Sequence, residues 1–136
     1  MSELKRFGRR LRRFINRPDV FEILAEGDWG AGGCWILAEA LVQWLGPPAR
    51  LVAVASSKLP VEHIAVEYID LYIDYQGAQT EDEFLSHLEA DGIDRPRIVE
   101  FAKYLQVKAR RSGIPCDVYQ VRQLISKLNT HFGSAR

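Results

Sequence analysis

The sequence contains little cysteine and no long apolar run. Its 136 residues include only two cysteines, Cys34 and Cys116, which is too few for a disulfide scaffold, so we expect two free thiols in a reducing compartment. No apolar stretch approaches the roughly 20 residues that cross a bilayer. The basic N-terminal segment is not followed by the apolar core of a signal peptide. These absences favour a cytoplasmic protein and argue against membrane-spanning and disulfide-rich classes.

Metal-site spacings and signs of a second domain are also missing. The chain has no CxxC or HxxxH spacing, so its scattered Cys, His and Asp residues make a poor metal site, and we expect neither a metal nor a cofactor. It has no internal repeat, low-complexity tract or clear linker. We therefore expect a single domain over residues 1–136, which is long enough to bury a core.

The net charge is zero, but the charges are unevenly distributed. Residues 1–17 carry seven Lys or Arg and one acid, a net charge of +6, so the remainder carries −6. Residues 3–16 are predicted to form an amphipathic helix, with arginines opposite its apolar stripe. This helix can pack its stripe on the core, contact an anionic membrane through residues 3–17, or bind nucleic-acid phosphates. Few aromatics are interleaved with the arginines, so nucleic acid is the least favoured partner.

The order of the predicted elements indicates an α+β fold. N-terminal helices and a glycine-rich loop precede a helix that packs on a small antiparallel sheet, and C-terminal helices follow. Residues 27–80 form the predicted core, and residues 81–136 the helical C-terminal part. The expected helices are 3–16, a short one from Pro18, Cys34–Leu45, one capped by Thr80 and running to about Glu89, Arg95–Arg111 and Asp117–Phe132; the expected strands are Arg50–Ala55, Glu62–Tyr68 and Leu71–Tyr75.

Cys34 occupies a position suited to a nucleophile. It follows the loop GDWGAGG, residues 27–33, and begins a predicted helix. The helix dipole and the free N–H groups of a first turn stabilise a thiolate, and the same N–H groups can bind an oxyanion. Glycines before the nucleophile, including Gly33, let a carbonyl substrate approach without a side-chain clash.

His63 and Asp74 can meet across a predicted hairpin. A two-residue turn at Ile69 and Asp70 puts both side chains on one face as diagonal neighbours, at roughly 7–8 Å between backbones. A three-residue turn would put Asp74 on the opposite face. In the two-residue register Gln76 lies opposite His63 and is an alternative residue for orienting the imidazole. With Cys34 as nucleophile, His63 would transfer the proton and Asp74 would orient His63.

These residues carry a family resemblance. The segment GGCWILAEALVQWLGPPARLVAV, followed by EHIAVEY and LYIDYQG, resembles the core of the papain-like and transglutaminase-like superfamily. The resemblance implies a Cys34, His63 and Asp74 triad acting through a thioester on amide bonds of a protein or peptide. Implied reactions are those of a protease, a glutamine deamidase or a transglutaminase. Compact versions of this fold occur as bacterial toxin and effector domains, so delivery as such a domain is a further expectation.

The resemblance also suggests which groups surround the thiol. Family members place a glutamine a few residues before the cysteine as an oxyanion donor, where this chain has Asp28. Because a carboxylate is a poor donor unless protonated, the Trp29 indole N–H and backbone N–H groups are expected substitutes. Trp29 and Trp35 are candidates to line a substrate groove or to pack in the core.

The alternative interpretation is a catalytically inactive papain-like protein that acts as an adaptor or inhibitor. Asp28 at the expected oxyanion position favours it. We interpret His87 and His131 as ordinary surface or helix-end residues and Cys116 as structural. The oligomeric state has no sequence signal.

Overall fold

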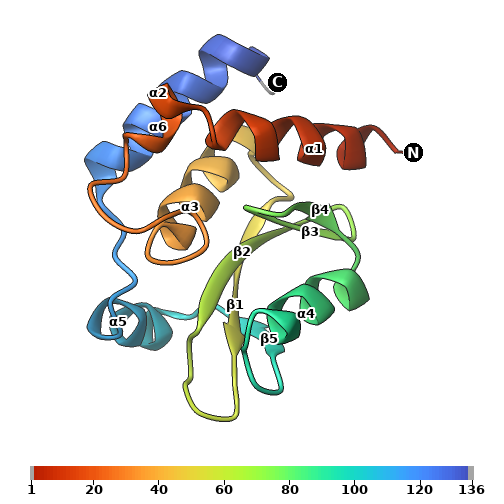
Figure 1. Ribbon diagram of the computed structural model, residues 1–136, viewed down its shortest axis with the longest axis vertical. Helices are drawn as coiled ribbons and strands as arrows, with labels where there is room; N and C mark the ends of the chain where they lie inside the picture. The colour runs from red at the N-terminus through yellow and green to blue at the C-terminus, as the bar shows by residue number, and fades with distance from the viewer. Residues whose placement is uncertain (1, 135–136) are drawn as a thin grey trace.

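The computed structural model describes residues 2–134 and contains six helices and five strands in this range (Figure 1). The elements are α1 (Glu3–Ile15), α2 (Pro18–Phe21), α3 (Cys34–Leu45), β1 (Arg50–Ala55), β2 (His63–Tyr68), β3 (Leu71–Asp74), β4 (Gly77–Gln79), α4 (Glu81–Ala90), β5 (Arg97–Glu100), α5 (Lys103–Arg111) and α6 (Val118–Phe132). The fold is α+β, as the sequence predicts.

The sheet is antiparallel throughout, with strand order β4-β3-β2-β1-β5. The β2–β3 hairpin has the two-residue turn that the pattern requires, since Tyr68 pairs with Leu71. The turn residues Ile69 and Asp70 have φ values of 46° and 63°. Positive φ at both positions is typical of the type I′ turn that matches the twist of a hairpin. The predicted register is therefore confirmed.

Two strands were not expected from the sequence. The predicted helix over Arg95–Arg111 is wrong in its first half, because Arg97–Glu100 forms β5 and pairs with β1, and the helix begins only at Lys103. The β-branched Ile98 and Val99 favour a strand, and the exposed edge of β1 supplies the hydrogen bonds. The other unexpected strand is β4, which pairs with β3 across a second two-residue turn.

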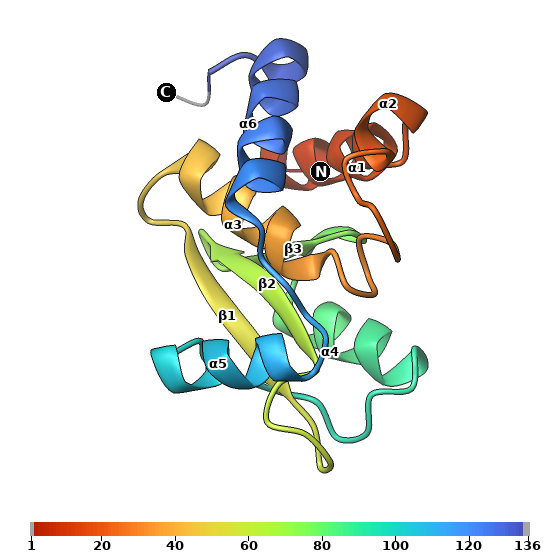
Figure 2. The ribbon, with the colours of Figure 1, turned by 90° about the vertical axis from the view of Figure 1, so that its left-hand side faces the viewer.

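Helix α3 is the central element of the core. Seven of its residues are buried, and it lies between the sheet and α6, while α1 packs on β4 (Figures 1 and 2). A second apolar cluster lies under α4, where Phe84 and Leu88 pack on side chains from β1, β2 and β3. On the other side of the sheet, α3 packs against β2, the strand that begins at His63.

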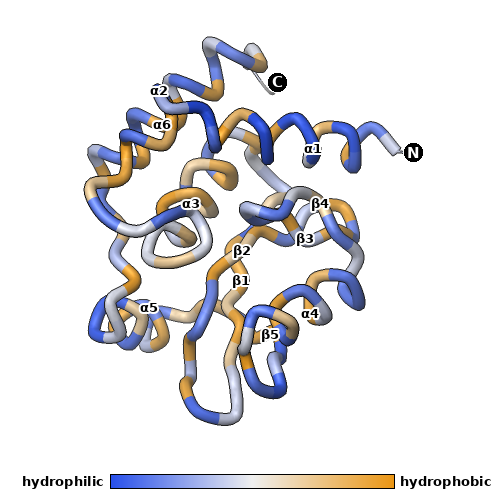
Figure 3. The backbone as a smooth tube through the Cα atoms, in the orientation of Figure 1, coloured by the Kyte–Doolittle hydropathy of each residue, from blue (hydrophilic) through white to orange (hydrophobic). Residues whose placement is uncertain are grey.

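The basic helix α1 packs its apolar stripe on the core. Leu11, Phe14 and Ile15 are buried, while the arginines of the helix are exposed. Hydrophilic and hydrophobic residues alternate along α1 (Figure 3). Gly8 lies against Ala78 of β4, and a Cβ atom at position 8 would come within 2.3 Å of the Ala78 nitrogen. This close approach requires glycine. Within residues 2–134, no helix combines the length and apolar character needed to cross a membrane.

Candidate active site

Cys34 is the first residue of α3 and is almost completely buried, with 3% of its surface exposed. Gly33 precedes it as the N-cap residue, and no side chain caps the helix. A Cβ atom at Gly33 would lie 2.8 Å from the Asp28 carbonyl oxygen and 2.7 Å from Leu24, so the loop can reach the helix only through glycine. The thiol therefore lies at the positive end of an uncapped helix dipole.

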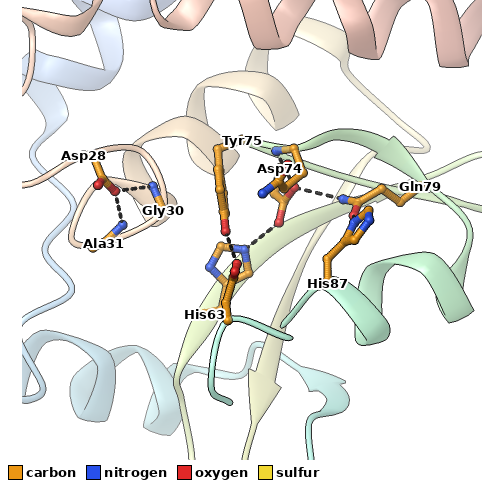
Figure 4. Close-up of polar contacts among 10 residues, drawn as sticks. Asp28, Gly30, Ala31, His63, Asp74, Tyr75, Gln79 and His87 are labelled. Carbon is orange, nitrogen blue, oxygen red and sulfur yellow. Dashed lines mark hydrogen bonds and ion pairs between the residues drawn. The ribbon is translucent and has the colours of Figure 1, made fainter. Parts of the chain in front are cut away.

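His63 and Asp74 form a buried hydrogen-bonded pair across the hairpin. The His63 Nε2 atom lies 2.8 Å from Asp74 Oδ2, and the side chains are 2% and 3% exposed (Figure 4). The hairpin register produces this contact, since His63 and Asp74 are diagonal neighbours on one face of β2 and β3. Because Nε2 contacts Asp74, Nδ1 is the ring nitrogen left for a second partner.

Cys34, at the start of α3, is the other group that acts on the imidazole. Burial lowers the pKa of the His63 imidazole, but hydrogen bonds to Asp74 and Cys34 and their negative charges outweigh it and raise the pKa to about 10. The positively charged imidazolium is thus the favoured form at neutral pH. The structure brings the three predicted residues together, one from α3, one from β2 and one from β3.

A second layer of polar groups holds Asp74. The other carboxylate oxygen, Oδ1, accepts hydrogen bonds from the Gln76 backbone N–H at 2.8 Å and from the Gln79 side-chain amide at 2.9 Å. The Gln79 side-chain oxygen in turn contacts Nδ1 of His87 on α4. Gln76 therefore supports the carboxylate through its backbone, although the sequence suggests a side-chain role in orienting His63.

Gln79 and His87 were not predicted as part of the site. Gln79 is 3% exposed and reaches Asp74 because the β3–β4 turn makes the two residues diagonal neighbours. The sequence signal was a second two-residue turn at Tyr75 and Gln76, which lacks glycine and asparagine and is hard to recognise. The contact with His87 depends on how α4 packs on the sheet.

The loop before Cys34 is held by Asp28. Its Oδ1 atom accepts hydrogen bonds from the backbone N–H groups of Gly30 and Ala31 at 2.8 and 2.6 Å (Figure 4). The carboxylate thus organises the loop and occupies two backbone donors. The expected role of Trp29 as an oxyanion donor does not fit, because its buried indole N–H donates to the Ile15 carbonyl oxygen at 2.7 Å.

A cavity of about 440 Å³ opens beside His63. Its walls come from the Asp28 loop, the start of β2, the β3–β4 turn and the end of α4. Tyr75 forms one wall: its ring meets the His63 ring edge-on at 5.9 Å, and its hydroxyl donates to Asp91 at 2.6 Å. Burial and this hydrogen bond raise the pKa of Tyr75 to about 12, so the hydroxyl stays protonated. The cavity is of the size that holds a small ligand or a side chain.

Trp35 and Cys116 lie at a different cavity, of about 410 Å³, between α3, α5 and α6. Trp35 packs on Phe101 and is 2% exposed, so it does not line the cavity at His63. Burial and the nearby Glu39 carboxylate raise the pKa of the Cys116 thiol to about 12, which keeps it protonated and unreactive at neutral pH.

Among residues 2–134, no group of three or more His, Cys, Asp or Glu side chains is placed to hold a metal ion. No family model, curated protein or solved structure is significantly similar to this chain. The geometry of the site is therefore the basis for assigning a function.

Proposed function

We propose that the protein is a thiol enzyme of papain-like or transglutaminase-like type that acts on an amide bond of a protein or peptide. The observation that carries this proposal is the buried His63 ring, which is hydrogen-bonded to Asp74 and interacts electrostatically with Cys34 at the start of α3. An imidazole between a carboxylate and a thiol at a helix N-terminus is the arrangement that activates a cysteine nucleophile.

The chemistry runs through a thioester. The Cys34 thiolate attacks the amide carbonyl carbon, and the Cys34 backbone N–H is a donor for the resulting oxyanion. The C–N bond then breaks as the protonated His63 gives its proton to the leaving amine. Water next attacks the thioester and loses a proton to His63, the C–S bond breaks, and the Cys34 thiolate and protonated His63 are restored. Asp74 stabilises the charged imidazole in both halves of the reaction.

Hydrolysis of a peptide bond, deamidation of glutamine and transfer to an amine share the first half of this cycle. They differ in the group that attacks the thioester. The proposal therefore covers all three reactions, and incubation with candidate proteins distinguishes them by mass: cleavage splits the chain, deamidation leaves a small mass gain, and transfer adds the whole amine.

The first test is the reactivity of the thiol. We expect iodoacetamide to modify Cys34 near neutral pH faster than a model peptide thiol, with Cys116 as the internal control that reacts slowly. Replacement of His63 by Ala should slow Cys34 modification, while Cys34→Ala should abolish the mass change in a substrate and preserve the fold. A Cys34 that reacts no faster than the peptide would contradict the proposal.

A second candidate is a binding protein that keeps this geometry without turnover, an adaptor or inhibitor. Two observations favour it. The Cys34 side chain is 97% covered and is not among the residues lining the cavity beside His63. Asp28 occupies the Gly30 and Ala31 N–H groups, which are then not available to an oxyanion. Two results together would select this candidate. Cys34 would be alkylated slowly, and both the wild type and Cys34→Ala would stably capture a protein partner.

A further inference from the structure

Trp35, which lines the cavity between α3, α5 and α6, has a polar group without a partner. The Trp35 Nε1 atom is buried, and its N–H has no acceptor among the described residues. The other two indoles both donate hydrogen bonds: Trp29 to Ile15, and Trp44 to Asn129 and to the Gly133 carbonyl oxygen. A buried donor left unpaired costs about 1–3 kcal/mol, so an acceptor from outside the chain would satisfy it.

The cavity around this donor is built for a ligand with one negative charge. Arg110 and Arg122 line it, and neither forms an ion pair with a residue of the described range. The Arg110 guanidinium lies 4.7 Å from the centre of the Trp35 ring, which keeps it beside the indole. Glu39 is the single carboxylate in the lining, so the cavity carries a net positive charge.

The lining also contains an apolar part. Val118 and Val121 of α6 and the Trp35 ring face the same space of about 410 Å³. Phosphate would use the guanidinium groups but not this apolar surface. A planar carboxylate matches the fork of a guanidinium and can accept from an indole N–H, while an attached hydrocarbon chain covers the valines.

We infer that this cavity is a second binding site, distinct from the one at His63, and that it takes a small organic monocarboxylate with an apolar tail. The carboxylate accepts from Trp35 Nε1 and pairs with Arg110, with Arg122 at the mouth. The two cavities share no lining residue. The inference does not depend on the proposed chemistry of Cys34, and it gives Trp35 a role in ligand binding away from the thiol.

The test uses the indole N–H resonance of Trp35 in an NMR titration of the full chain. Hexanoate is the probe, hexanamide is its uncharged equivalent, and inorganic phosphate tests a bare anion. The Trp35→Phe variant assigns the resonance. We expect a saturable downfield shift of this resonance with millimolar hexanoate, no shift with hexanamide or phosphate, and unmoved Trp29 and Trp44 resonances.

Matched variants show whether the cavity itself holds the probe. Arg110→Gln should weaken hexanoate binding about tenfold, the effect of losing one charge-assisted contact. Arg111→Gln, on the next residue of α5 but outside the lining, should leave binding unchanged. If hexanoate fails to move the Trp35 resonance, if hexanamide or phosphate moves it equally, or if Arg111→Gln weakens binding as much, the inference is overturned. The wild type alone gives the first two outcomes, so they do not depend on the folding of any variant.

Discussion

Replacement of Asp74 by Asn tests the electrostatic core of the site. The substitution keeps the shape of the side chain and removes its charge. In the wild type the pKa of His63 is raised from 6.5 to about 10, which corresponds to about 5 kcal/mol of extra stabilisation of the imidazolium. Asp74 and Cys34 share this stabilisation. We therefore expect Asp74→Asn to lower the pKa of His63 and to cost about 3 kcal/mol of folding free energy at pH 6.

The sign of the pH dependence follows from the raised pKa. A group whose pKa is higher in the folded state contributes its full stabilisation below its unfolded pKa, here 6.5, and loses it as the pH rises toward about 10. The difference in free energy of unfolding between the wild type and Asp74→Asn should thus shrink progressively between pH 6.5 and 10. At pH 10 the two proteins should differ much less than at pH 6.

Urea unfolding at pH 6, 8 and 10 measures the difference in free energy, and imidazole NMR signals follow the His63 pKa directly. Alkylation of Cys34 in the same variant reports the thiol, and we expect it to be slower because the imidazolium is less stable. A variant whose free energy of unfolding lies within about 0.5 kcal/mol of the wild type at pH 6, inside the usual range for neutral surface substitutions, would show that Asp74 does not stabilise the His63 imidazolium. A stability difference that does not change from pH 6 to pH 10 would lead to the same conclusion.

Substitutions at three further positions test the support of the site and the packing of the fold. Gln79→Leu removes the amide that donates to the buried Asp74 carboxylate. We therefore expect the free energy of unfolding in urea to fall by about 1–3 kcal/mol and Cys34 to be alkylated more slowly. Gln79→Glu keeps the shape of the side chain but adds a charge, and it should destabilise the protein at least as much. Asp70→Gly relieves a positive φ in the hairpin turn and should raise the stability by about 1 kcal/mol, measured as a higher midpoint in urea. Gly8→Ala places a Cβ atom against the backbone of Ala78 and should destabilise by about 1–3 kcal/mol, with a lower thermal midpoint. A stable Gly8→Ala variant would contradict the packing of α1 on β4.

Local patterns in the sequence determined much of the site. Cys34 follows glycines and begins an apolar stripe, which predicts a helix start from neighbouring residues alone. The distance between His63 and Asp74 follows from the alternation of two strands and the two residues between them. Such features depend on backbone geometry over a few residues, and the predicted register is the one found.

Other features depend on contacts between residues far apart in the chain and could be seen only in the folded protein. Arg97–Glu100 became a strand because the edge of β1 was free to pair, although its periodicity also fits a helix. The sequence offered both Trp29 and Trp35 as groove or core residues, yet the Trp29 indole donates to Ile15 and the Trp35 indole has no acceptor among the described residues. The hydrogen bonds from Gln79 to Asp74 and to His87 form only when the β2–β3 and β3–β4 turns are made and α4 packs on the sheet. Periodicity cannot predict such contacts, because it reports which face of an element is buried and not which residue lies opposite.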